Sequence, residues 1–207
     1  FQIVLFLINM SITDGTLRIC GDEITVVRNL SGEIGSYALL AGSVQLTKPF
    51  QIETFQEVKF QTDSGIAAGD LVRRNRDNQY YLCTSVNKEG IFNVSEYLQG
   101  VLYKCNISGE VQRFRLTRTY NTEAPSMNWY SPSSGIIWGI LNTFNQMNHD
   151  SEIGDITTAK VNLWLQSSVD VQPKDRFVSS GEKWIINTVD AHSFPGVKFI
   201  EVDVDTR

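Results

Sequence analysis

The chain has 207 residues, of which 42% are hydrophobic and 20% are charged, and its formal net charge is −5. This length and apolar content suffice to bury one sizeable core or two small ones. The acidic balance argues against a protein whose whole surface grips nucleic acid, because phosphate neutralisation needs an excess or strong clustering of Lys and Arg. The cysteines, Cys20, Cys83 and Cys105, lack CxxC spacing, which favours reduced thiols in a cytoplasmic setting.

The segment Phe1–Ile8 is a dense apolar run. It is shorter than the roughly 20 apolar residues that span a bilayer, and it lacks the basic region of a signal peptide, so no membrane association is expected. One interpretation is a β-strand whose side chains, Val4 and Phe6 among them, are covered by another subunit. The other is that Met10 begins the native protein. We expect the strand to need a partner, because an exposed apolar strand promotes aggregation.

The first half of the chain is expected to be mostly strands. Loose alternation over residues 15–30 predicts a hairpin, and residues 37–46 fit either a strand or a short helical turn. A strand is predicted at Val58–Phe60. A hairpin then follows over residues 69–86, with Val101–Cys105 as its third strand.

Residues 111–120, VQRFRLTRTY, place basic and apolar side chains on opposite faces of a predicted strand. The next residues, 121–134, are rich in Ser, Asn and Pro, and we expect the chain to divide there. Apolar residues then recur at helical spacing over 135–147, which predicts an amphipathic helix, with a strand at Ile136–Leu141 as the alternative. Residues 158–165 alternate again and predict a strand.

The stretch Lys174–Val204 has the pattern strand, turn, strand, loop, strand. One pattern occurs twice, near residues 70–86 and near residues 175–189. It consists of an Asp, an apolar pair, a polar turn and an aromatic strand that ends in Val. This is either a weak internal repeat or the ordinary likeness of two hairpins. The prediction is a mainly β protein with two small β-barrel or sandwich-like units, divided as residues 1–122, a connecting segment 123–156 with the possible helix, and residues 157–207.

The sequence contains no recognised catalytic, metal or cofactor motif, so we expect a protein that is not an enzyme and holds no cofactor. His149 lies near an acidic loop that we interpret as solvated, and His192 beside Asp190 is a pair that many chains contain. Two arginine groups are either ion-paired, solvated faces or contacts for phosphates or an acidic partner. Their members are Arg73, Arg74 and Arg76, and Arg113, Arg115 and Arg118; the acidic residues that could complement them across an interface are Glu201, Asp203 and Asp205.

Aromatic residues gather near the expected division, at Trp129, Tyr130 and Trp138. Aromatic side chains in a polar segment suggest either packing under a neighbouring subunit or a platform on which a sugar ring stacks. The second interpretation would make the chain a carbohydrate-binding module.

Residues 157–205 resemble the last part of small neck proteins of tailed bacteriophages, of the head-closure or head–tail connector type. The resemblance lies in the strand TTAKVNLWLQ, the turn QPKDRF, the hairpin SSGEKWIINTVDA and the closing strand PGVKFIEVDVD. The earlier segment AAGDLVRRNRDNQYYLCTSV is similar to corresponding hairpins of phage connectors. Head-closure proteins often form one small β-barrel, whereas this chain is long enough for two.

The resemblance implies a homo-oligomeric ring in the virion, assembled in the host cytoplasm. The ring would surround the DNA channel, close to genomic DNA without specific contacts, and would bind portal, neck or tail proteins. A tail-tube component, a baseplate component or a carbohydrate-binding tail-fibre module is the alternative.

Overall fold

The computed structural model describes residues 12–28, 32–42, 55–91, 94–117, 126–133, 135–150 and 154–205. The chain forms two compact units, Phe1–Cys105 and Asn106–Arg207. The division therefore lies upstream of residues 121–134, where the sequence predicted it, and the predicted boundaries at 122 and 156 fall inside the second unit. The Ser, Asn and Pro residues of 121–134 suggested a boundary between units, but the strand Ser126–Tyr130 of the second unit lies within this segment.

The first unit is a closed antiparallel barrel with the strand order β1-β2-β3-β6-β5-β4, in which β4 also pairs with β1. Its elements are α2 (Ile12–Cys20), β1 (Asp22–Arg28), β2 (Gly32–Gly42), β3 (Phe55–Phe60), β4 (Leu71–Arg74), β5 (Gln79–Ile91) and β6 (Val94–Lys104). Alternate residues of each strand point inward, and their apolar side chains fill the barrel. Fully buried members of this core include Ile24, Val26, Val58, Phe60, Tyr81 and Leu102.

The predicted hairpin over residues 15–30 is only half correct, because residues 12–20 form the helix α2 and only β1 follows as a strand. Leu17 of this helix is buried. The amide of Gly21 donates to the Leu17 carbonyl at 2.8 Å and ends the helix. A side chain at position 21 would place its Cβ 2.4 Å from that carbonyl oxygen, so the close approach requires glycine.

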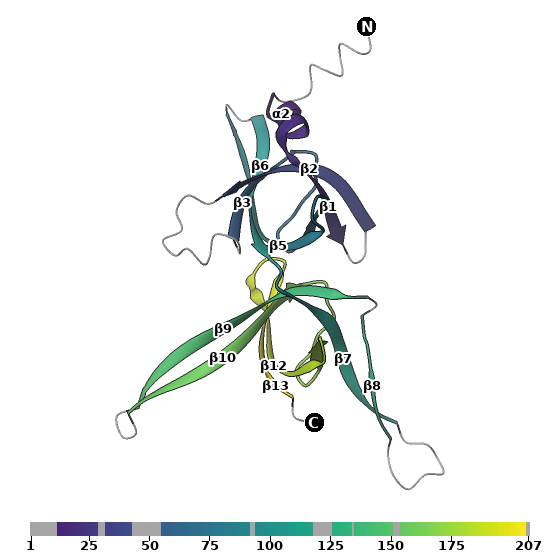
Figure 1. Ribbon diagram of the computed structural model, residues 1–207, viewed down its shortest axis with the longest axis vertical. Coiled ribbons are helices and arrows are strands. Elements are labelled where there is room, and N and C mark those ends of the chain that lie inside the picture. The colour runs from purple at the N-terminus through teal and green to yellow at the C-terminus, as the bar shows by residue number, and fades with distance from the viewer. Residues whose placement is uncertain are drawn as a thin grey trace. The chain divides into compact units, whose positions relative to one another are not determined.

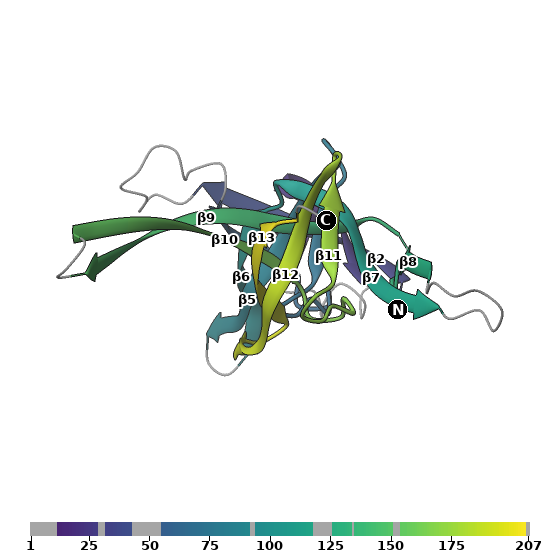
Figure 2. The ribbon, with the colours of Figure 1, turned by 90° about the horizontal axis from the view of Figure 1, so that it is seen from below.

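The second unit is a second closed barrel, with β8 as an additional strand. Its strands are β7 (Ile107–Thr117), β8, β9 (Ile137–Asp150), β10 (Gly154–Gln166), β11 (Arg176–Ser179), β12 (Glu182–Phe194) and β13 (Val197–Val204). They pair in the order β11-β12-β13-β10-β9-β7-β8, and β11 also pairs with β7 to close the barrel (Figure 2). The mainly β architecture with two barrel units is thus confirmed.

The helix predicted at residues 135–147 is wrong, and the alternative strand is right, because these residues belong to β9. The apolar residues do have helical spacing, but pairing with β10 over nearly the whole strand outweighs it. Gly139 lets β10 approach closely, since a Cβ there would lie 2.8 Å from the carbonyl oxygen of Trp164.

The two barrels repeat one another strand for strand, which confirms the internal repeat. The first barrel order β1-β2-β3-β6-β5-β4 corresponds to β7-β9-β10-β13-β12-β11 in the second. The registers agree as well. In the first barrel Val72 of β4 pairs with Val26 on one side and Tyr81 on the other. In the second barrel Phe177 of β11 pairs with Val111 and Trp184 at the corresponding positions.

Irregular features repeat at the same places, which a shared strand order alone does not require. A bulge follows Cys83 in the pairing of β5 with β6, and a bulge follows Ile186 in the pairing of β12 with β13. The loops before β4 and β11 have the same length and the same pattern of hydrogen bonds. Residues 61–70 thus correspond one by one to residues 166–175.

Candidate functional site

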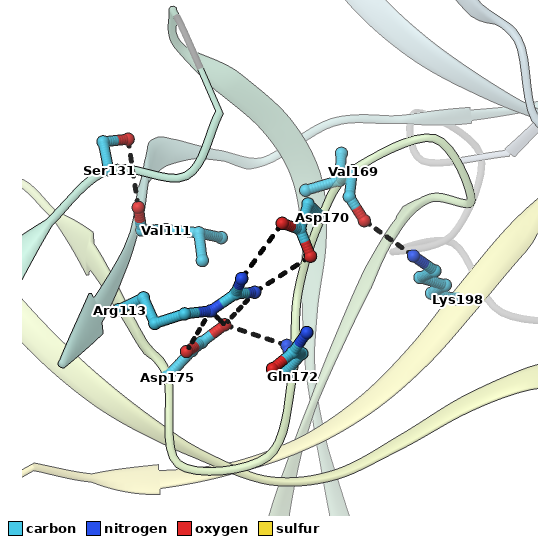
Figure 3. A network of polar contacts seen from close by, with 8 residues as sticks. All are labelled: Val111, Arg113, Ser131, Val169, Asp170, Gln172, Asp175 and Lys198. Carbon is cyan, nitrogen blue, oxygen red and sulfur yellow. Dashed lines mark hydrogen bonds and ion pairs between the residues drawn. The ribbon is translucent and has the colours of Figure 1, made fainter. Parts of the chain in front are cut away.

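An ion-pair network around the buried Asp175 fixes the loop that enters β11. The guanidinium of Arg113, on β7, donates from Nε and Nη2 to the carboxylate of Asp175 at 3.0–3.3 Å. It also donates to both oxygens of Asp170, at 2.9 and 3.0 Å (Figure 3). Asp175 has only 4% of its side chain exposed and accepts the amide of Gln172 at 2.9 Å. One arginine therefore holds both ends of a six-residue loop segment, Asp170–Asp175.

The electrostatics of this network favour the charged forms. The hydrogen bonds that Arg113 donates to Asp170 and then to Asp175 raise the pKa of Arg113 above its ordinary value, against the smaller effect of burial. The same guanidinium lowers the pKa of Asp170. Lys198 adds a further tie by donating to the carbonyl of Val169 at 2.6 Å.

The first barrel contains the same arrangement of an arginine and a loop aspartate at the corresponding positions. Arg28, the last residue of β1, donates from Nε to both oxygens of Asp70 at 3.0 and 3.1 Å, and from Nη2 at 2.6 Å. Asp70 accepts the amide of Ala67 at 2.9 Å, as Asp175 accepts that of Gln172. Where the second loop has Asp170, the first has Gly65, whose carbonyl accepts from Arg28. We call each arrangement, Arg28–Asp70 and Arg113–Asp175, an Arg–Asp clamp.

The clamp has a structural role, because its arginine and aspartate side chains bond to each other and to backbone groups of the same loop. Neither clamp contains a nucleophile or a set of convergent metal ligands, and no group of His, Cys, Asp and Glu suited to a metal ion is found among the described residues. What each clamp supplies is a rigid loop at one end of a barrel, with exposed residues such as Asp63 and Ser167.

The arginines predicted as one basic group in the first unit are all paired with acidic residues of the same unit. Arg73 lies 3.5 Å from Glu33, Arg76 lies 3.6 Å from Asp22, and Arg74 binds Asp77. The hydrogen bond from Arg74 lowers the pKa of Asp77 to about 2. This geometry supports the ion-pair interpretation of the group over phosphate contacts.

The second arginine group does not act as one face. Arg113 pairs with Asp170 and Asp175 in the clamp, and its assignment as an interface or channel residue stays a prediction. Arg115 lies two residues further along β7 and is exposed. Arg118 lies outside the described residues.

Glu201 and Asp203 lie on the outer face of β13, and Asp205 directly follows that strand. Asp203 is exposed and accepts the side-chain amide of Asn187 at 2.6 Å. Glu201 accepts the hydroxyl of Thr188 at 3.4 Å, and Asp205 donates its backbone amide to Lys183 at 2.8 Å.

The aromatic residues near the expected division do not form one platform. Trp129 packs its ring 5.4 Å from that of Phe114, and the guanidinium of Arg176 lies 3.8 Å from its centroid. Tyr130 follows it on β8 and points to the other face of the strand, and Trp138 lies on β9. Val4 and Phe6 lie outside the described residues.

The pair Asp190 and His192 lies at an irregularity of β12, where the register against β13 shifts between Asp190 and Phe194. The Asp190 carboxylate accepts the backbone amides of His192 and Ser193, at 2.9 and 3.2 Å, and the Ser193 hydroxyl. These hydrogen bonds, the hydroxyl first, lower the pKa of Asp190. His149 lies on β9.

The thiols of the first unit differ sharply in exposure, which gives a testable expectation. Burial raises the pKa of Cys83 and of Cys105 to about 12, whereas Cys20 is exposed. Because the thiolate is the reactive form, Ellman's reagent at pH 8 should modify Cys20 rapidly in the native protein and the other two only after unfolding. Rapid reaction of more than one thiol per native chain would contradict the described burial.

The feature best suited to contact another molecule is a long two-stranded ribbon in the second unit. Residues 144–150 of β9 pair with residues 154–160 of β10, whereas β13 pairs with β10 only from Val161 onward. Among the described strands, each strand of this ribbon therefore has one neighbour and one open edge. The ribbon extends away from the barrel of its own unit (Figure 1).

Sequence reasoning missed this ribbon because it assigned the start of one of its strands, residues 144–147, to a helix. The alternation at residues 158–165 and the strand alternative at residues 136–141 were the signals that could have found it.

A shorter arm consists of β8 and residues 113–117 of β7, which pair with each other. We call these the β9–β10 ribbon and the β7–β8 arm.

Comparisons with known proteins identify no relative. No family model matches the chain, and no curated protein and no solved structure is significantly similar to it. In the part of the chain that is described, no helix is long and apolar enough to cross a membrane.

Proposed function

We propose that this chain is a structural subunit of a ring at the head–tail junction of a tailed bacteriophage. In this role it links the portal or adaptor to tail proteins around the DNA channel. The likeness of residues 157–205 to neck proteins supports the location, and those residues form most of β10 and all of β11–β13. A tail-tube or baseplate subunit would use the same contacts with different partners.

The β9–β10 ribbon is the observation that carries the proposal of assembly. An isolated two-stranded hairpin is marginally stable in water, and an open strand edge is a template for another strand. Both edges of this ribbon are open among the described residues. Pairing with a neighbouring copy would stabilise the ribbon, and repeated head-to-tail contacts of this kind close into a ring when the rotation permits.

The charges of the chain suit a channel that DNA passes through. The net charge is −5, and the arginines of β4 and its turn are neutralised by acidic neighbours. Such a surface lacks the excess of cations that holds phosphates tightly. The ring would therefore surround DNA without retaining it.

Shortening the ribbon tests the proposal. Lys160 pairs with Phe144, so residues 145–159 can be replaced by Asn-Gly, which forms a tight type I′ hairpin turn. We expect the shortened chain to keep its barrels, as judged by circular dichroism, but to lose the oligomer that the full chain forms in size-exclusion chromatography with light scattering.

The matched control applies the same turn to the hairpin of β5 and β6, between the paired residues Glu89 and Tyr97. This variant should assemble like the full chain. Normal assembly of the chain with the shortened β9–β10 ribbon, or a full chain that stays monomeric at every concentration, would refute the proposal.

A further inference from the structure

Arg176 is a cation held in a fixed position at the base of the β7–β8 arm. Its Nε donates to Oε1 of Gln112 at 2.8 Å, and its guanidinium carbon lies 3.8 Å from the ring centroid of Trp129. The ring of Trp129 in turn contacts that of Phe114. Stacking on the indole and the hydrogen bond at Nε fix the plane of the guanidinium, so its terminal donors, Nη1 and Nη2, are preorganised.

Arg176 also lacks the acidic partner that most arginines of this chain have. Among the described residues, no Asp or Glu forms an ion pair with Arg176, and Arg115 shares this property but is exposed, whereas Arg176 is half-buried. A half-buried cation without a counter-ion favours the binding of an anion, because water solvates it only in part. The arginines that do pair with an Asp or Glu of their own unit are Arg18, Arg28, Arg73, Arg74, Arg76 and Arg113.

The first barrel shows that an arginine is not needed here to close the fold. The pair Arg176 and Gln112 corresponds in register to the pair Leu71 and Val27 of the first barrel. Leu71 is buried, and the first barrel has no counterpart of the β7–β8 arm. The arginine and the tryptophan on which it stacks thus occur together, in the barrel that has the arm.

The surface next to Arg176 is apolar. Alternation places Gln112, Phe114 and Leu116 on one face of β7. Strand pairing places Arg176 opposite Gln112 and Trp129 opposite Phe114, on that same face. Leu116 is 57% exposed. A fixed cation therefore borders an exposed apolar surface, the combination that marks an interaction site.

We propose that Arg176 binds a carboxylate of a partner protein, and that an apolar side chain beside this carboxylate packs on Phe114 and Leu116. The two terminal donors of a guanidinium match the two oxygens of a carboxylate. A nucleic-acid backbone fits less well, because it is held by several cations and the exposed Glu110 shares this face of β7. The inference concerns the chemistry of the partner and does not depend on ring assembly.

Titration of the full chain with hydrocinnamate, followed by NMR, tests the site. This probe joins a carboxylate to an apolar ring. We expect it to shift the signals of the Arg176 Nε–H and of the Trp129 indole N–H, with a Kd on the order of millimolar. The uncharged hydrocinnamide and inorganic phosphate should each bind about tenfold more weakly or not at all.

Three variants assign the binding to Arg176. Arg176→Leu places the residue of the first barrel at this position and should abolish the shift of the Trp129 signal, with the barrels intact by circular dichroism. Arg176→Lys keeps the charge but loses the planar fork, so it should weaken binding about tenfold. Arg115→Leu is the matched control, because this exposed arginine lies on the other face of β7, and it should bind hydrocinnamate as the original chain does.

The outcomes decide the assignment. Signals that hydrocinnamate leaves unchanged, or equal binding by the chain with Arg176→Leu, would refute the site. Equal binding of hydrocinnamate and hydrocinnamide would refute it as well, and this comparison needs no variant. Phosphate that binds more tightly than hydrocinnamate would refute a protein carboxylate and indicate nucleic acid. None of these results bears on ring assembly, which size-exclusion chromatography measures separately.

Discussion

Replacing Asp175 with alanine should destabilise the second unit by about 3 kcal/mol, since removing one partner of a buried ion pair leaves the other charge uncompensated. Asp175 is almost fully buried, and its carboxylate accepts hydrogen bonds from Arg113 and from the amide of Gln172. Without it the guanidinium keeps only the more exposed Asp170, and the loop amide loses its acceptor. Two buried polar contacts are thus lost at one position.

Tryptophan fluorescence during urea unfolding measures this effect in the second unit alone. All four tryptophans of the chain, Trp129, Trp138, Trp164 and Trp184, lie in that unit. The control is Asp170→Ala, which removes a 53% exposed partner of the same arginine and should cost about 1 kcal/mol or less. Equal effects of the two substitutions would contradict the assignment of Asp175 as the buried anchor.

Exchanging the clamped loops should preserve the second barrel. When residues 166–175 are replaced by the sequence of residues 61–70, an Asp again occupies the anchor position and faces Arg113. Gly then replaces Lys174, whose φ of 77° favours glycine, while Ser replaces the buried Val169. Loss of that buried side chain should cost about 2 kcal/mol, so the barrel should still unfold cooperatively.

A shifted exchange provides the sharp control. Inserting residues 62–71 at the same place moves the Asp by one position and puts Leu in front of Arg113. We expect this chain to fail to fold, because the partly buried Arg113 then loses its buried partner and an apolar residue takes the place of that carboxylate. If the shifted and unshifted exchanges are equally stable by urea unfolding, the two loops are not equivalent.

Local patterns predicted most of the second barrel. Alternation at residues 158–165 and in the last strand located buried positions such as Leu163 and Ile200, because one face of each strand is inside the barrel, whereas Val204 at the end of β13 is 73% exposed. The likeness of residues 70–86 to 175–189 also indicated the repeat. The helix at residues 135–147 failed for a physical reason, since periodicity cannot distinguish a short apolar strand from a helix when pairing partners are unknown.

The clamps and the ribbon could not be predicted in this way. Arg113 and Asp175 are far apart in the sequence, as are Arg28 and Asp70, and no local pattern links an arginine to a distant carboxylate. The sequence did show an Asp before an apolar pair in both halves, which is one side of each clamp. The arginines of the first unit that were predicted as a basic group form ion pairs. The sequence did not show this, because the acidic partners of Arg73 and Arg76 lie on other strands.

Negative-stain electron microscopy of the purified full chain is the most direct measurement of whether copies close into a ring. We expect closed rings of one size with an open centre, and their loss when the β9–β10 ribbon is shortened. Fields of small single particles of the 23.3 kDa chain at every concentration, or open filaments in place of rings, would contradict the assignment.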